Sequence, residues 1–124
     1  MNYFWVALGG ALGAMARFGA VQLATTRWGM SFPWGTLTVN VTGSLLIGFL
    51  ATILSSRQSD PALRLLLITG ALGGYTTFSA FSFEALALIT EQRHLAVAGY
   101  IVGSVLLGLA AAALGTALAF AITR

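Results

Sequence analysis

Four long apolar stretches follow one another along the chain, with short polar segments between them. Residues 28–56, 65–83 and 95–123 are free of charged side chains, and the first 26 residues carry one charge, at Arg17. A helix needs about 20 mostly apolar residues to cross the hydrocarbon core of a bilayer. The pattern therefore predicts a single all-α transmembrane domain over residues 1–124. Its four helices are expected at about residues 3–26, 33–55, 61–91 and 95–122.

Local signals support these boundaries and predict how the helices pack. Asp60 and Pro61 form an N-cap followed by a first-turn proline, which starts the third span. Gly9 and Gly13 in the first span have the spacing that lets helix backbones approach closely in lipid. Gly99 and Gly103 repeat this spacing in the fourth span, where we expect the same close packing; Ala111 and Gly115 extend that small face.

The third span contains an unusual segment before its middle. Gly70, Gly73 and Gly74 are followed by Thr76 and Thr77, and both residue types weaken a helix. One interpretation is a set of glycines that serves only packing. The other is a broken helix whose freed carbonyl groups can hold a cation, which is tolerated at membrane depth where protein or water covers the backbone.

The arginines are distributed almost evenly between the two ends of the predicted bundle. If both termini share one side, that side holds Arg57, Arg64 and Arg124. The other side holds Arg27 and Arg93, with Arg17 within the first span as a third candidate. So small a difference sets no direction of insertion by the positive-inside rule. Two copies inserted in opposite directions would form an antiparallel homodimer. We therefore expect dual topology, and an oligomer, because four helices alone leave little space for a pore.

Composition excludes several classes of protein. Of the 124 residues, 58% are hydrophobic and 7% are charged, far below the charge of a soluble domain. The net charge of +3 comes from scattered arginines, which do not form the clustered basic face that nucleic-acid binding requires. The single histidine, three acidic residues and absence of cysteine provide no nucleophile–base pair and no metal-ligand spacing. The sequence thus predicts a multi-pass membrane protein that is not an enzyme.

A few polar side chains inside the spans require a reason. Arg17 and Glu84 are ionisable groups within apolar segments, which are costly and functional by default. A direct pair between them is one interpretation, and snorkelling of Arg17 to the interface is another. Asn40 belongs to a four-residue series with Thr36 and Ser44 on one face of the second span. It either donates to a ligand or bonds a neighbouring helix.

Two further features suggest a path that favours anions. Tyr100 and Ser104 repeat the four-residue step in the fourth span. Phe78 and Phe81 lie three residues apart with Ser82 beside them, and the edge of an aromatic ring is positive. Ring edges and neutral donors can hold a small anion without a basic residue, whereas ordinary core packing is the simpler interpretation of the two rings.

Three segments resemble the Fluc (CrcB) family of fluoride channels, and the similarity extends over essentially the whole chain. The most specific segment is GGYTTFSAFSFE at residues 73–84, where the family signature reads GGxTTFSTFSxE. The other two are GALGAMAR at residues 10–17 and GTLTVNVTGS at residues 35–44. Ala80 departs from the signature threonine, and Gly108 stands where a further serine could extend the hydroxyl series.

The resemblance implies a dual-topology antiparallel homodimer in the bacterial inner membrane that exports fluoride by passive flow through two pores. The aromatic pair of the family's pores falls on Phe78 and Phe81, its asparagine on Asn40 and its threonine on Thr38. A structural Na⁺ at the dimer axis would be held by main-chain carbonyls that match Gly73 and Thr76. The same resemblance places Tyr100 and Ser104 in the polar lining.

The main alternative is a small proton-coupled drug exporter with four spans and dual topology. Such exporters depend on a glutamate embedded in the first helix, and the first span here contains no acidic residue. A purely structural four-helix subunit is a third interpretation, but it would need neither a broken helix nor stripes of donors.

Overall fold

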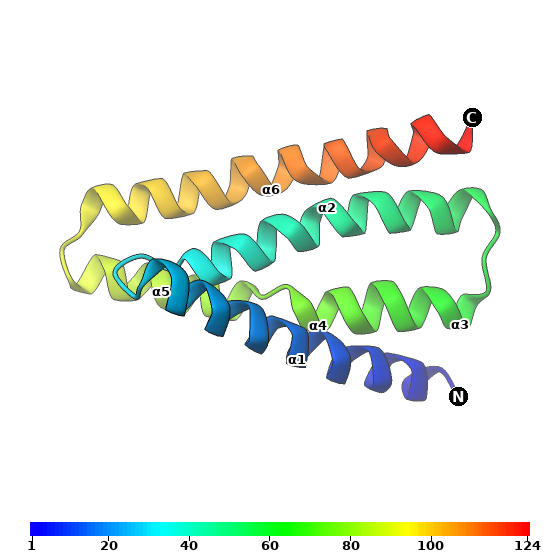
Figure 1. Ribbon diagram of the computed structural model, residues 1–124, viewed down its shortest axis with the longest axis horizontal. Helices are drawn as coiled ribbons and strands as arrows, with labels where there is room; N and C mark the ends of the chain where they lie inside the picture. Colours follow the sequence, from blue (N-terminus) through cyan, green and yellow to red (C-terminus); the bar gives the residue numbers. More distant parts are fainter.

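The computed structural model describes all 124 residues, and the chain is helical throughout, with no strands. Its four spans are α1 (Asn2–Trp28), α2 (Trp34–Ser56), a composite third span (Pro61–Thr90) and α6 (His94–Thr123). Each is long and apolar enough to cross a membrane. No span ends more than two residues from the position predicted from the sequence. The spans lie side by side as a bundle, with both chain termini at the same end (Figure 1).

The third span consists of four segments: α3 (Pro61–Arg64), the π-helix η1 (Leu65–Leu72), α4 (Gly73–Tyr75) and α5 (Phe78–Thr90). As predicted, Asp60 caps its start, where the carboxylate accepts a hydrogen bond from the Ala62 N–H at 2.9 Å. The helix is interrupted at Thr76 and Thr77, and both residues have extended backbone angles. The expected break is therefore present between α4 and α5, where the ribbon is visibly uncoiled (Figure 1).

Gly70, Gly73 and Gly74 do not themselves break the helix. All three are helical, and two of them lie against α1: a Cβ at Gly70 would meet the Cα of Gly9 at 2.9 Å. A Cβ at Gly74 would meet the carbonyl oxygen of Gly10 at 2.5 Å. The packing interpretation of Gly70 and Gly74 is thus correct, and the two threonines make the break.

Small residues also join α2 to α6, which form the most extensive helix pair of the bundle. A Cβ at Gly48 would collide with the backbone of Ala112, and one at Gly115 with the backbone of Leu45. The Thr116 hydroxyl donates to the Gly48 carbonyl at 3.3 Å across this contact. The packing expected for Gly9 and Gly13 is likewise present, because a Cβ on either would collide with the backbone of η1.

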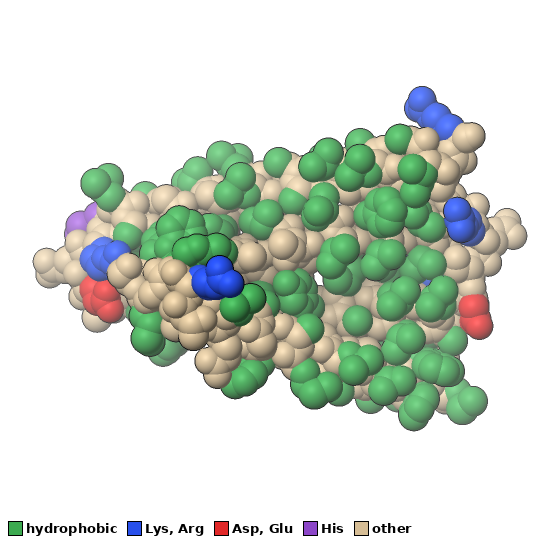
Figure 2. Space-filling model, in the orientation of Figure 1, with side chains coloured by type: hydrophobic (Ala, Val, Ile, Leu, Met, Phe, Trp, Pro, Cys, Tyr) green, Lys and Arg blue, Asp and Glu red, His purple; other side chains and the backbone are tan.

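The packing expected for Gly99 and Gly103 does not occur within the chain, because a Cβ at either position would meet nothing within 4 Å. This reflects a wider property of the fold, in which 18 of 124 residues are buried. Hydrophobic side chains cover the length of the visible face, and most charged side chains lie at its two ends (Figure 2). Such a surface suits contact with lipid or with another membrane-embedded chain.

Candidate functional site

The break between α4 and α5 is braced by one side chain from α2. The amide nitrogen of Asn40 donates to the Thr77 carbonyl at 3.0 Å, and the Thr77 N–H donates to the Asn40 side-chain oxygen at 2.8 Å. The two bonds satisfy the backbone of an extended residue that has no helical partner. Because an unpaired backbone group at membrane depth costs several kcal/mol, this pairing is what makes the break tolerable.

The two hydrogen bonds between Asn40 and Thr77, called the brace below, accompany a loss of donors from the carbonyl groups of Gly73 and Thr76. In a continuous helix, the Thr77 N–H would donate to Gly73 and the Ala80 N–H would donate to Thr76. Here the Thr77 N–H is bonded to Asn40, and the Ala80 N–H donates to the Thr77 hydroxyl at 3.2 Å. The Thr76 carbonyl accepts no hydrogen bond, and the Gly73 carbonyl loses its usual donor. Both oxygens are therefore available as ligands.

An open groove lies along the break, between α2 and the third span. It has a volume of about 410 Å³ and includes Asn40, Ser44, Thr69, Gly73 and Thr76. Polar side chains of both helices therefore reach this groove, beside apolar residues such as Ile47 and Ile68. Phe78, at the start of α5, borders it with its side chain 78% exposed.

Aromatic rings follow one another from the break into the bundle. The ring centroids of Phe78 and Phe81 are 5.6 Å apart, and those of Phe81 and Tyr100 are 5.1 Å apart. Phe32 then meets Tyr100 edge-to-face at 5.5 Å. The series connects α5 to α6 and to the segment before α2, so the predicted aromatic pair is part of a longer run of rings.

Glu84 on α5 lies at the end of this series, in contact with two hydroxyl groups. Thr36 donates to one carboxylate oxygen at 2.8 Å, and Tyr100, which is fully buried, donates to the other at 2.7 Å. Both carboxylate oxygens therefore have partners from neighbouring helices. The direct pair of Glu84 with Arg17 does not form, and Arg17 is half-buried on α1 without an ion-pair partner.

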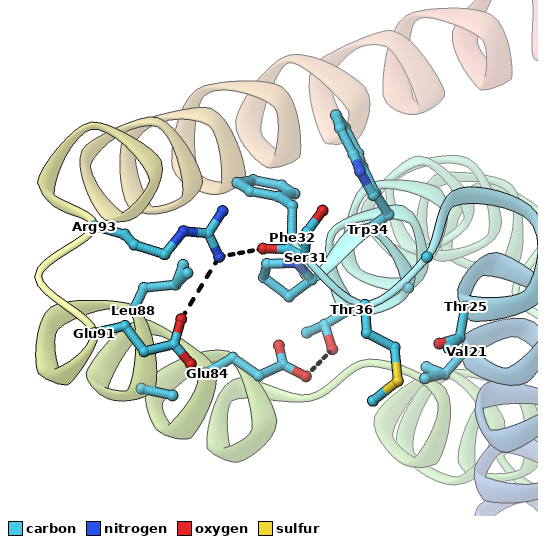
Figure 3. Close-up of a pocket in the computed structure, with 15 residues that line it drawn as sticks. Val21, Thr25, Ser31, Phe32, Trp34, Thr36, Glu84, Leu88, Glu91 and Arg93 are labelled. Atoms are coloured by element: carbon cyan, nitrogen blue, oxygen red, sulfur yellow. Dashed lines mark hydrogen bonds and ion pairs between the residues drawn. The ribbon is translucent and has the colours of Figure 1, made fainter.

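A second cavity, of about 330 Å³, opens at the end of the bundle that holds the α1–α2 and α5–α6 loops. Figure 3 shows Glu84 and Thr36 facing one another on one side of it, and Glu91 and Arg93 facing one another on the other side. Arg93 bridges the two loops, because its guanidinium donates to the Ser31 carbonyl and lies 3.7 Å from the Glu91 carboxylate. The cavity therefore extends from Glu84 and Thr36 to the loops at the end of the bundle.

Most of the predicted site residues are brought together. Phe78, Phe81, Tyr100, Asn40 and Glu84 lie along one continuous path from the break towards the cavity. The Ser82 hydroxyl donates to the Phe78 carbonyl at 2.9 Å. The hydroxyl oxygen of Ser104 is the one buried side-chain oxygen or nitrogen without a hydrogen-bond partner.

Thr38 lies elsewhere on α2. Residues two positions apart on a helix point to nearly opposite sides, so Thr38 faces away from Asn40. It borders an apolar groove of about 390 Å³ together with Trp28, Trp34 and Leu107. Its assignment to a pore remains a prediction from the resemblance.

Sequence reasoning did not single out two features of the site. Spacing places Thr36 on the same face as Asn40 but does not reveal that its hydroxyl bonds Glu84. A hydrogen bond from Asn40 to a neighbouring helix was one of its two interpretations, and the bonds to Thr77 confirm it. Spacing alone did not identify Thr77 as the partner.

The fold and the site together define a multi-pass α-helical membrane protein whose third span is interrupted and braced by a side chain. The family model described as "CrcB-like protein, Camphor Resistance (CrcB)" matches residues 4–116, and the chain belongs to this family. The resemblance noted in the sequence is thereby confirmed.

Relatives of nearly the same length are named "Fluoride-specific ion channel FluC". The relative from Rhizobium meliloti (strain 1021) is 50% identical over 114 residues, which are 91% of this chain and 91% of the relative. The relative from Roseiflexus sp. (strain RS-1) is 45% identical over 120 residues, covering 96% and 97%. The relative from Rhizobium etli (strain CIAT 652) is 51% identical over 117 residues, covering 92% of each. The family is thus one of ion channels rather than enzymes.

Proposed function

We propose that this chain is a subunit of a passive, fluoride-selective channel that exports fluoride from the cytoplasm across the bacterial inner membrane. The observation that carries the proposal is the similarity over more than nine-tenths of the chain to proteins named fluoride-specific ion channels. The drug-exporter alternative finds no support, since α1 contains no acidic residue and the chain belongs to the CrcB family.

The chemistry of the path suits a small, strongly hydrated anion. A pore must replace the hydration shell of such an ion while holding it weakly enough to release it. We assign this role to the ring edges of Phe78 and Phe81 and to the neutral donors of Asn40, Ser82, Tyr100 and Ser104. Asn40 keeps a second amide N–H beside its bond to Thr77. The hydroxyls of Ser82 and Tyr100 donate to the Phe78 carbonyl and to Glu84, and would exchange these bonds for one to the ion. The unpartnered Ser104 hydroxyl supports this assignment, because a buried donor without a partner favours a ligand.

A second copy of the chain completes the pathway in this proposal. The groove beside the break contains the polar side chains of Asn40, Ser44 and Thr69 at mid-span, where polar groups in contact with lipid are costly. Covering the groove with another subunit removes this cost. The near balance of arginines between the two ends favours insertion in both directions, and hence an antiparallel pair.

The carbonyl groups of Gly73 and Thr76 would hold a structural Na⁺ at the axis of this dimer. They fit the ion in chemistry, because both have lost their helical donors and hard cations prefer oxygen ligands. Two carbonyls from each of two copies would supply four oxygens. The bound ion would contribute a fixed positive charge near the centre of the assembly.

Replacing Phe81 by isoleucine tests the role of the aromatic series. Phe81→Ile retains apolar bulk but removes the ring between Phe78 and Tyr100, so we expect fluoride efflux from liposomes to fall by about tenfold or more, which corresponds to the loss of at least about 1.4 kcal/mol of ion stabilisation. The purified protein should remain dimeric on size-exclusion chromatography.

Phe83→Ile is the matched control, because Phe83 is 74% exposed and forms no ring contact with the series. Its efflux should equal that of the unmodified protein. Unchanged efflux in Phe81→Ile would remove the aromatic series from the proposed pathway.

A further inference from the structure

The cavity at the end of the bundle has an unusual balance of charge for the route of an anion. Its lining contains three charged residues, namely Glu84, Glu91 and Arg93. Two of them are acidic, so without Arg93 the cavity would present negative charge alone to an approaching fluoride. Arg93 is the one cation that offsets them (Figure 3).

Arg93 is held at the opening of the cavity rather than deep inside it. Its side chain is 38% exposed, and its guanidinium is fixed by the Ser31 carbonyl and the Glu91 carboxylate. A guanidinium has five N–H donors, and both recorded interactions use the same nitrogen, Nη1. Donors therefore remain free to meet an anion from the water.

We propose that Arg93 recruits fluoride to this cavity by offsetting one of the two negative charges that Glu84 and Glu91 bring to it. The inference rests on the proposed function, since it assumes that fluoride passes through the cavity. Arg93 acts by raising the local concentration of the anion at the opening, and it is not part of the selective path through the aromatic rings. Because the charge is exposed, its effect depends on ionic strength.

The test compares Arg93→Gln with the unmodified protein in liposome fluoride efflux at two concentrations of an impermeant gluconate salt. The Debye length falls from about 30 Å at 0.01 M to about 3 Å at 1 M, so an electrostatic effect disappears at high salt. We expect Arg93→Gln to lower efflux about threefold at low salt and to leave it unchanged at high salt. Arg93→Lys should retain most of the efflux.

The double variant Glu91→Gln/Arg93→Gln separates charge from mechanical support of the loops. It restores the original net charge of the cavity but still lacks the bond to Ser31. Recovery of efflux at low salt supports recruitment by charge. No recovery would show that Arg93 acts by tying the loops together, and would overturn the proposal.

Arg27→Gln is the matched control for insertion. It removes one arginine from the same end of the bundle, and Arg27 is exposed and does not line the cavity. Equal efflux in Arg93→Gln and Arg27→Gln at every salt concentration, with active unmodified protein, would refute recruitment by Arg93. Absence of fluoride efflux from the unmodified protein would instead refute the proposed function itself.

Discussion

Replacing Asn40 by alanine is expected to abolish fluoride efflux and to destabilise the purified protein. The variant leaves both the N–H and the carbonyl of Thr77 without partners. An unsatisfied buried group costs about 1–3 kcal/mol, so the loss of both is a large fraction of the stability of a small protein. Thermal unfolding followed by tryptophan fluorescence, together with efflux from liposomes, measures the two effects.

Thr52→Val provides the matched control on the same helix. The Thr52 hydroxyl bonds back to the Gly48 carbonyl within α2, so its loss leaves the break intact and should change neither measurement. Asn40→Asp adds a second comparison, because an ionised carboxylate can accept from the Thr77 N–H but cannot donate to its carbonyl. If Asn40→Ala unfolded at the same temperature as Thr52→Val, with efflux within about twofold, the role assigned to this brace would be wrong.

The second large effect is expected from variants that fix the direction of insertion. Arg57→Gln/Arg64→Gln/Gln92→Lys moves positive charge towards one end of the bundle, and Arg27→Gln/Gln58→Lys moves it towards the other end. Under the positive-inside rule, each variant inserts mainly one way. Each should therefore be almost inactive when expressed alone, and co-expression should restore efflux.

All substituted positions are exposed, and none of them lines the groove beside the break or the cavity at the end of the bundle. Cysteine labelling from the two sides of the membrane, with a single cysteine introduced in place of exposed Ser56, reports the direction in which each variant inserts. Full activity of either variant alone, with one direction of insertion established, would contradict the antiparallel dimer.

The spans and their ends could be predicted from sequence because lipid imposes a simple rule on composition. Charged residues at positions 27, 57, 64, 84 and 124 divide the apolar stretches, and Asp60 with Pro61 starts the third span through contacts one or two residues apart. Such local signals do not depend on the rest of the fold.

The position of the break required knowledge of contacts between distant segments. Glycines are weaker helix formers than threonines, so propensity alone favours a break at Gly73 and Gly74. Gly74 instead stays helical against α1, while Asn40, 37 residues before Thr77, supplies the partner that lets the backbone open there. A hydrogen bond between distant segments thus determines which of the two sites of low helix propensity leaves the helical conformation.

The same reason explains the partners of Glu84. Its hydroxyl partners lie 48 residues earlier, on α2, and 16 residues later, on α6. No spacing within one helix connects these residues, and Arg17 carried the more obvious complementary charge. The aromatic pair was predictable as a unit, because Phe78 and Phe81 lie on one face of one helix.

The central claim, a channel selective for fluoride, is tested most directly by ion efflux from liposomes that contain the purified protein. Vesicles loaded with fluoride or with chloride are compared at equal concentration, with valinomycin and K⁺ present to balance charge. We expect rapid loss of fluoride and retention of chloride at the level of protein-free vesicles. Equal efflux of the two anions, or no efflux of fluoride, would contradict it.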